Sequence, residues 1–340
     1  MWEDIDHSHI YGQASFRLYS AVELVDLITQ LCDWPMLVAI GNTCVRERRL
    51  VNDIICKRVA TCIARFIFPS SFDRFFELIS LASAALVGGF VRHIMCLNET
   101  IYDEVYPCSI DIIVPIGGGR DRSAARRLAH FLSNTGPCLQ MMELESLSPH
   151  HMVSRFTFMC SNEVLSYCFL QMWLVHWCSH ITQALRINVI ECEDNNIFKV
   201  FLSASETVLF NVLTSHHIYC FYPSLLSRRT NVATSTYTPP QSSILSSFNF
   251  GLTTFDTELA FSDFPGICQE GCYSKTRSLF GLEGVLINRW GGIGGFCDDG
   301  TSSCDRSKTD GYEILDYQWR IGFNCLNPLC PYYGMGYRDW

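Results

Sequence analysis

The sequence predicts an α+β protein made of a small helical module, a mixed-sheet α/β domain and a tail rich in Cys, Gly and aromatic residues. Apolar residues at helical spacing indicate the module. A Gly-Gly corner followed by a short β-branched run indicates the domain. With 48% hydrophobic and 17% charged residues, the chain can bury sizeable cores. We place the three parts at residues 19–68, 72–229 and 250–340, with a Ser/Thr/Pro-rich linker at 230–249.

Three short helices are predicted in residues 19–68. The first runs from about residue 22 to 31, and Ser20 suits its N-cap. The sequence DWP at 33–35 ends that helix and begins the next, because proline fits a first helical turn. A third helix is predicted from about residue 50 to 63. Tight turns between them make a compact helical unit.

Helices and strands alternate in the α/β domain. The predicted helices and strands differ in composition, since the strands are richer in β-branched and aromatic residues. Helices are expected at 72–89, 120–136 and 203–215, and strands at 108–115, 151–160, 167–177 and 185–192. The helix at 72–89 leads into Gly88-Gly89, and His216-His217 then follows the end of the helix at 203–215.

The strand CSIDIIVP carries the pattern that points to chemistry. Ser109 and Asp111 are two residues apart, so a strand presents both on one face. Paired carboxylates at this spacing hold the Mg²⁺ ions of nucleotidyl transfer. Gly88 and Gly89 let the backbone approach a triphosphate closely. We therefore expect Gly88-Gly89 at the mouth of a central strand, and Gly88, Gly89 and Asp111 are the candidate nucleotide-binding residues.

The order of segments around this strand resembles the nucleotidyltransferase superfamily motif, a hydrophobic residue with Gly-Gly or Gly-Ser followed by h-D-x-D-h. It resembles in particular the fungal F-box-like proteins that carry a nucleotidyltransferase-type fold. LRINVIECED at 185–194 and VFLSASETVLFNVLTSHHIYCFYPSLLSRRT at 200–230 share this likeness. The resemblance therefore extends over roughly residues 22–230.

The resemblance implies a degenerate site. It places Ser109 at the first carboxylate position, Asp111 at the second and Asn188 near the third. Two of three metal ligands would then be neutral, and Mg²⁺ dehydrates reluctantly without charged ligands. No catalytic residue, metal or cofactor is expected on this basis. The acids that could substitute from nearby segments are Asp103, Glu104, Glu191 and Glu193.

The helical module resembles an F-box in AVELVDLI, CDWPMLVAI and NTCVRERRLV, although the usual Leu-Pro at the start is absent. This resemblance implies that residues 19–68 bind the adaptor of a cullin ubiquitin ligase. An ordinary three-helix bundle that caps the next domain is the alternative. The candidate partner-binding residues are Val22, Leu24, Leu27, Trp34 and Leu37.

Three functional hypotheses follow. The leading one is a non-catalytic protein-interaction protein, an F-box-type adaptor-binding chain with a degenerate nucleotidyltransferase domain. The competing one is an active, metal-dependent nucleotidyltransferase with relocated carboxylates. The third is a structural remnant that has kept no partner.

The 18 cysteines are expected to be thiols, because most stand singly in apolar runs. Cys268, Cys272, Cys325 and Cys330 approximate the spacing of zinc ligands, but the spacing is looser than C-x-x-C. Unpaired thiols are the favoured interpretation. His216 and His217 are adjacent, so one helix face cannot direct both to a metal.

Charge and hydropathy indicate which partners and which compartment to expect for the chain. The net charge of −9 argues against nucleic-acid binding, which needs Lys and Arg against phosphate. The start MWEDIDHSHIYG lacks the basic and apolar regions of a secretory signal. Residues 78–91 are apolar but too short to span a membrane, and 164–185 include His and Gln side chains. We expect an intracellular protein, cytoplasmic or nuclear, without membrane contact.

Overall fold

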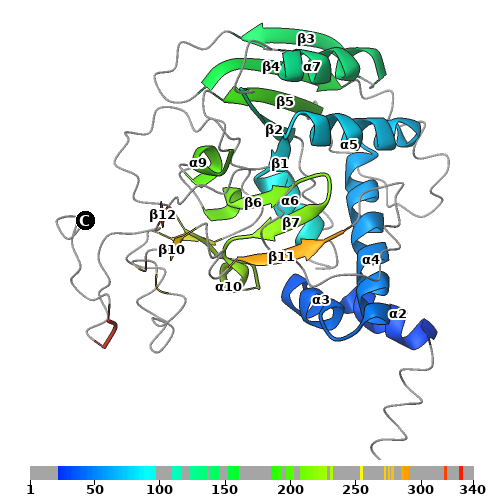
Figure 1. The fold of residues 1–340 in the computed structure, drawn as a ribbon, viewed down its shortest axis with the longest axis vertical. Helices are drawn as coiled ribbons and strands as arrows, with labels where there is room; N and C mark the ends of the chain where they lie inside the picture. Colours follow the sequence, from blue (N-terminus) through cyan, green and yellow to red (C-terminus); the bar gives the residue numbers. More distant parts are fainter. Residues whose placement is uncertain are drawn as a thin grey trace, which may run out of the picture.

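The chain folds as a mixed α/β protein with helices at the amino-terminal end and one large mixed sheet (Figure 1). The coarse fold class predicted from sequence is thus confirmed. The structure is a computed structural model, and it describes residues 22–96, 109–116, 123–135, 138–144, 152–160, 185–192, 197–202, 207–227, 230–232, 253–255, 272, 275, 277–278, 285–290, 318–319 and 329–331.

Three helices open the described chain, as the sequence predicts: α2 (Val22–Leu31), α3 (Trp34–Gly41) and α4 (Val45–Ile63). Helix α3 begins where Asp33 caps it, because the Asp33 carboxylate accepts a hydrogen bond from the Met36 amide at 2.9 Å. The third helix starts at Val45, earlier than predicted. Ser20, the predicted cap of α2, lies outside the described residues.

The helix predicted at 72–89 is three elements. The 3₁₀ turn η1 (Pro69–Ser71) comes first. Helix α5 (Phe72–Leu81), strand β1 (Ala85–Val87) and helix α6 (Gly89–Cys96) then follow in order. Ser83 adopts a left-handed φ of 45°, and the amide of Ala84 donates to the Ile79 carbonyl at 2.9 Å. This Schellman-type end frees residues 85–87 to form a strand. The apolar run 78–91 is therefore divided among two helices and a strand.

Eight of the described strands form one sheet in the order β11-β7-β6-β1-β2-β5-β4-β3. Strand β2 pairs in parallel with β5, and the other neighbours are antiparallel. The sequence did not predict β3. The strands are β2 (Ser109–Pro115), β3 (Cys138–Leu144), β4 (Met152–Cys160), β5 (Leu185–Cys192), β6 (Asn211–Leu213), β7 (His217–Cys220) and β11 (Leu286–Arg289).

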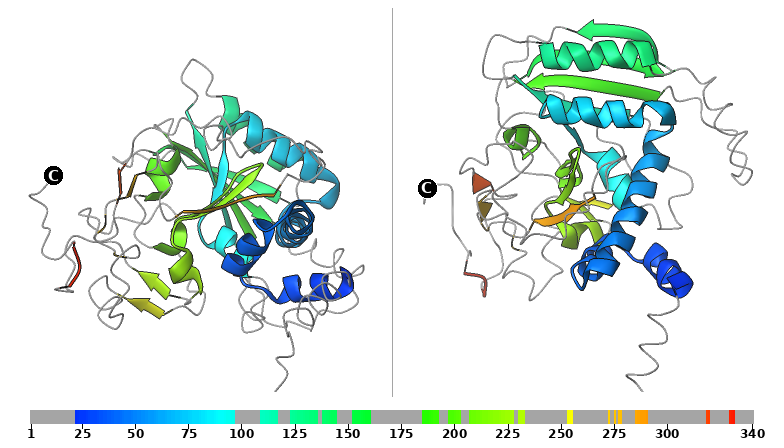
Figure 2. Two further views of the ribbon diagram at one scale, coloured as in Figure 1. Left: turned by 60° about the horizontal axis from the view of Figure 1, so that its bottom comes forward. Right: turned by 45° about the vertical axis from the view of Figure 1, so that its right-hand side comes forward.

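Helices cover both faces of this sheet. Helix α5 lies beside α7 (Ser123–Thr135) on one face, and α9 (Ile197–Leu202) lies on the other (Figure 2). Phe75 of α5 stacks on Phe131 of α7 with ring centres 6.4 Å apart. Within the part of the chain that the structure describes, no helix combines the length and apolar character that a membrane crossing needs.

The predicted helix at 203–215 is wrong. Of the described residues in this stretch, 207–215, only η3 (Thr207–Leu209) is helical, and β6 and β7 form a hairpin. Thr214 closes its turn, since its hydroxyl accepts the His217 amide at 2.9 Å and its own amide donates to the His217 carbonyl at 2.8 Å. His216-His217 therefore stands at a hairpin turn and not at a helix end. The predicted strand at 167–177 lies outside the described residues.

Part of the tail belongs to the main sheet. Strand β11, from the segment that the sequence separates as a tail, pairs with β7. Trp290 follows it into the core, where its indole N–H donates to the Thr214 carbonyl at 3.1 Å and its ring meets Phe76 edge-on at 4.9 Å. The other described elements are α10 (Pro223–Ser227) and the pairs β8 (Thr230–Val232) with β9 (Thr253–Phe255) and β10 (Arg277–Ser278) with β12 (Gln318–Trp319).

One hydrophobic core joins the helical module to the sheet. The same cluster of buried residues contains Trp34 and Leu37 of α3 together with Ile110 of β2 and Val189 of β5. The module thus packs on the α/β domain through shared apolar surface, which is the main favourable term in holding such layers together.

A buried arginine connects three helices of this core. Arg58 of α4 donates from Nη1 to the Met95 carbonyl at 3.1 Å and from Nη2 to the Cys32 carbonyl at 3.4 Å. Those carbonyls lie at the ends of α6 and α2, where the helix dipoles favour a cation. Burial lowers the pKa of Arg58. The guanidinium therefore satisfies helix-end carbonyls that would otherwise be buried without a donor.

Replacing Arg58 should be costly. We expect Arg58→Ala to lower the free energy of unfolding by about 3 kcal/mol, because two buried carbonyls lose a charged donor. Arg74→Ala is the matched control: its ion pair with Glu77, at 2.6 Å, is exposed and should contribute less than about 0.5 kcal/mol. Urea unfolding followed by circular dichroism measures both. Equal losses in the two variants would contradict the role given to Arg58.

Candidate functional site

Strand β2 places Ser109 and Asp111 in the middle of the sheet. The predicted strand is confirmed, and period-two alternation puts both side chains on one face. Both are buried, as is Asn188 on the parallel neighbour β5. In the register, Asp111 lies opposite Val87 on one side and opposite Asn188 on the other. The structure therefore brings the three predicted positions together.

Gly88 forms the corner next to these residues. It directly follows Val87 and has a φ of 81°, in the left-handed region that favours glycine. Its amide donates to the Asn211 carbonyl at 3.0 Å, and its carbonyl accepts from the Arg92 amide at 3.1 Å. Because β1 and β2 are antiparallel, the end of β1 at this corner lies beside the start of β2. The predicted position of the Gly-Gly corner is confirmed.

Asp111 and Asn188 are directly hydrogen-bonded. The Asn188 amide donates from Nδ2 to Oδ1 of Asp111 at 2.6 Å, and the two side chains are 2% and 4% exposed. A metal-binding strand pair would place carboxylate oxygens of both residues on one cation. Here a neutral donor holds the carboxylate oxygen instead. The pair fits a structural hydrogen bond that satisfies a buried carboxylate.

Glu191 does not lie on the same face as Asp111. It is three residues after Asn188 on β5 and pairs in register with Val114, so alternation directs it to the opposite face of the sheet. The proposal that Glu191 replaces a missing ligand at Asp111 is therefore not supported by the strand geometry. The other acids considered, Asp103, Glu104 and Glu193, lie outside the described residues.

His93, one turn into the helix that follows this corner, is buried and uncharged at neutral pH. Burial, with a further contribution from Arg65, lowers the pKa of His93 on α6 to about 4. The imidazole is therefore neutral near pH 7. Among the residues that the structure describes, no three His, Cys, Asp or Glu side chains gather closely enough to hold a metal ion.

The predicted partner-binding residues divide into two groups. Trp34 and Leu37 are 1% and 0% exposed, so they belong to the core and are not available to a partner. The prediction for these two is wrong because α3 packs against α4, α10 and β11. Leu24 and Leu27 of α2 are exposed as predicted. The side chain of Val22 is outside what the structure describes.

Sequence reasoning missed four other exposed apolar side chains of the helical module. Ile28 and Leu31 of α2, Met36 of α3 and Val45 of α4 are also exposed. A signal was present in VELVDLITQL, which has more apolar residues than one buried helix face needs. Val25, Thr29 and Cys32 already supply the buried face.

Two of the four cysteines with zinc-like spacing meet. The sulfur atoms of Cys272 and Cys330 are 3.6 Å apart, and both residues are buried. Cys268 and Cys325 lie outside the described residues. Cys32 and Cys62 are buried thiols in the helical module, as expected of small apolar side chains.

Comparison with protein-family models, with curated proteins and with solved structures finds no match to this chain.

Substitutions at Gly88 and Ser83, which both have a positive φ, should change the free energy of unfolding in opposite directions. We expect Gly88→Ala to lower the free energy of unfolding by about 1–3 kcal/mol, since a side chain at this φ is strained. The new Cβ would also lie 3.3 Å from Cδ2 of Leu209. Ser83→Gly should act in the opposite direction and raise it by about 0.5–1 kcal/mol, because Ser83 also has a positive φ. Urea titration of the two variants checks both signs, and destabilisation by Ser83→Gly would contradict the backbone argument.

Proposed function

We propose that this chain is a non-catalytic protein-interaction protein that binds a partner through the outer face of α2. One observation carries the proposal: Leu24, Leu27, Ile28 and Leu31 are 45–74% exposed on a single helix. Scattered exposed leucines need no explanation, but a contiguous apolar surface indicates an interaction site.

The spacing of these residues makes them one stripe. Positions 24, 27, 28 and 31 follow the i, i+3, i+4, i+7 pattern, so their side chains lie along the same side of the helix. The adjacent side of α2, with Val25 and Thr29, is buried, and α2 contacts α4. Helix α2 is thus apolar on two faces and uses only one of them within the described chain.

Two further apolar side chains of the helical module are exposed. Met36 on α3 and Val45 at the start of α4 are 58% and 60% exposed. A helix that presents apolar anchors at this spacing suits a hydrophobic groove on a partner. The F-box resemblance of residues 19–68 favours the adaptor subunit of a cullin ubiquitin ligase as that partner.

The second part of the proposal is that the α/β domain is a degenerate nucleotidyltransferase-type domain. The corner at Gly88, the adjacent strand with Asp111 and the parallel strand with Asn188 support it. An active enzyme with relocated carboxylates is less well supported, because Glu191 lies on the other face of the sheet. The domain then serves as a scaffold for the helical module.

Binding should depend on the α2 stripe. We expect the full chain to capture the purified adaptor and Leu24→Ser/Leu31→Ser to weaken capture roughly tenfold or more, as for central apolar anchors. Leu81→Ser, which changes a leucine 68% exposed on α5, is the matched control and should bind normally. If the native chain does not bind, the adaptor is not its partner. If the α2 variant binds as well as the native chain, the α2 stripe is not the binding surface.

Nucleotide transfer should be absent. With labelled ATP and Mg²⁺ or Mn²⁺, we expect no turnover by the native chain, because only Asp111 supplies a carboxylate at the three expected positions. Ser109→Asp/Asn188→Asp restores the other two and should add a rise in Tm with Mn²⁺ that the native chain lacks. Asn188→Asp alone changes one buried residue instead of two, so it is the variant to measure if the double variant does not fold. Turnover by the native chain that Asp111→Ala abolishes would overturn this part of the proposal.

A further inference from the structure

A buried thiol pair in the tail stands apart from the site and from the α2 stripe. Cys272 and Cys330 are 58 positions apart in sequence, yet their sulfur atoms are 3.6 Å apart. The residues are 1% and 5% exposed. A disulfide needs the sulfurs at about 2.05 Å, so the two thiols are within a short side-chain movement of bond formation.

An arginine anchors the first of these cysteines. Arg277 is buried and donates from Nη2 to the Cys272 carbonyl at 3.2 Å and from Nη1 to the Lys275 carbonyl at 3.2 Å. Its guanidinium also lies over the ring of Tyr222, 5.0 Å from the ring centre. Tyr222 packs in turn on Phe210, next to η3. The position of Cys272 is therefore set by contacts to the main domain.

The second cysteine lies just below the surface. Leu329, which precedes Cys330, is 91% exposed, and Pro331 after it is exposed as well. Cys330 is 5% exposed and Cys272 1%, so local opening of residues 329–331 would bring Cys330 to a reagent first. Cys272 lies deeper and faces the sulfur of Cys330.

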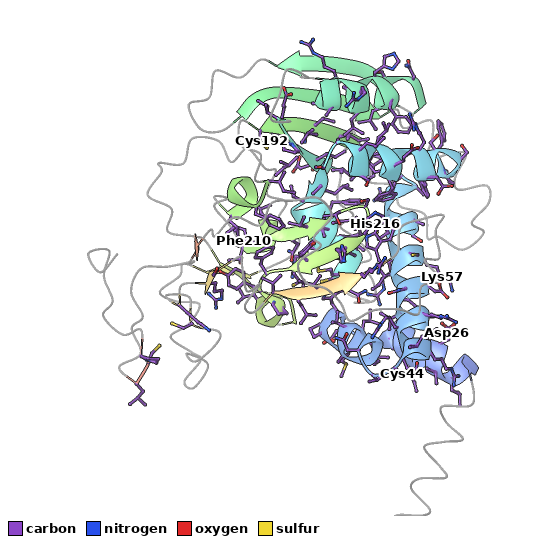
Figure 3. All side chains as sticks on the ribbon, in the orientation of Figure 1. Asp26, Cys44, Lys57, Cys192, Phe210 and His216 are labelled. Carbon is purple, nitrogen blue, oxygen red and sulfur yellow. The ribbon has the colours of Figure 1, made fainter. Side chains whose placement is uncertain are left out.

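Three other cysteines among the described residues serve as comparisons. Burial raises the pKa of both Cys62 and Cys220 to about 12, so these cysteines stay protonated and unreactive. Cys44 is exposed at the start of α4, on the side of the molecule away from β10 and β12 (Figure 3). Cys44 can form a mixed disulfide with a small reagent, and it therefore serves as the control thiol in the experiment below.

We propose that Cys272 and Cys330 form a reversible disulfide by exchange with a small-molecule disulfide such as oxidised glutathione. The Cys330 thiolate attacks one sulfur of the reagent, which forms a mixed disulfide and releases one glutathione thiol. The Cys272 sulfur then gives up its proton and attacks Sγ of Cys330, releasing the second glutathione thiol. Two cysteine thiols are oxidised and one glutathione disulfide is reduced, so atoms and electrons balance.

The link would close the tail on the domain. Segment 329–331 would be joined covalently to Cys272, which Arg277 already ties to Tyr222. Local opening of this part of the tail then becomes more costly, because the cross-link restricts the opened chain. Oxidation thus converts a packing contact into a covalent disulfide, and reducing conditions break it again.

The test treats the native full chain with oxidised glutathione and maps peptides by mass spectrometry without reduction. We expect a Cys272–Cys330 cross-linked peptide, two hydrogens lighter than the separate peptides, that dithiothreitol reverses. Cys272→Ser should instead retain one glutathione on Cys330. Cys44→Ser should leave the cross-link unchanged.

A second readout covers loss of structure in the variants. The oxidised native chain should resist proteolysis near residue 330 more than the reduced chain, and circular dichroism shows whether Cys272→Ser is folded. A native chain that keeps glutathione on Cys330, or leaves both thiols free, would overturn the proposal. So would stoichiometric zinc in the purified chain that Cys272→Ser removes, because the thiols would then be metal ligands.

Discussion

The left-handed turn at Gly88 is the constraint on which the rest of the fold depends. Strand β1 is inserted between β2 and β6, and α6 must begin at the next residue. The chain reverses there because Gly88 can adopt a φ of 81° while its amide bonds to Asn211 and its carbonyl starts α6. At the other end of α6, the Met95 carbonyl accepts from Arg58. One glycine thus sets the path that connects the sheet to the helical module.

The polar residues beside that turn satisfy one another. A carboxylate in the middle of a sheet is costly unless donors reach it, and Asn188 supplies a donor to Asp111 at 2.6 Å. Because the strand is parallel and in register, the same alternation that brings Asn188 to Asp111 turns Glu191 to the other face. The hydrogen bond satisfies this buried carboxylate with a neutral donor.

The helical module is attached on one side and open on the other. Trp34 and Leu37 share the core of the sheet, and Trp290 from far along the chain packs against Phe76. These contacts leave α2 at the margin, with a second apolar face directed outward. Burying that face would be favourable, so it is the surface that the proposed partner would cover while the core of the module stays unchanged.

The sequence by itself determined the local elements whose signals are local. The spacing of apolar residues and the Asp-Trp-Pro sequence at 33–35 predicted α2, α3 and α4, and the β-branched run predicted β2. Long-range packing decided the rest. Residues 85–87 and 211–213 became strands because neighbours in the sheet satisfy their backbone, although their composition also suits a helix. Likewise, only the tertiary structure placed β11 on β7, buried Trp34, turned Glu191 away and brought Cys272 to Cys330. Such outcomes rest on contacts between residues far apart in the chain, and neither composition nor local periodicity records those contacts.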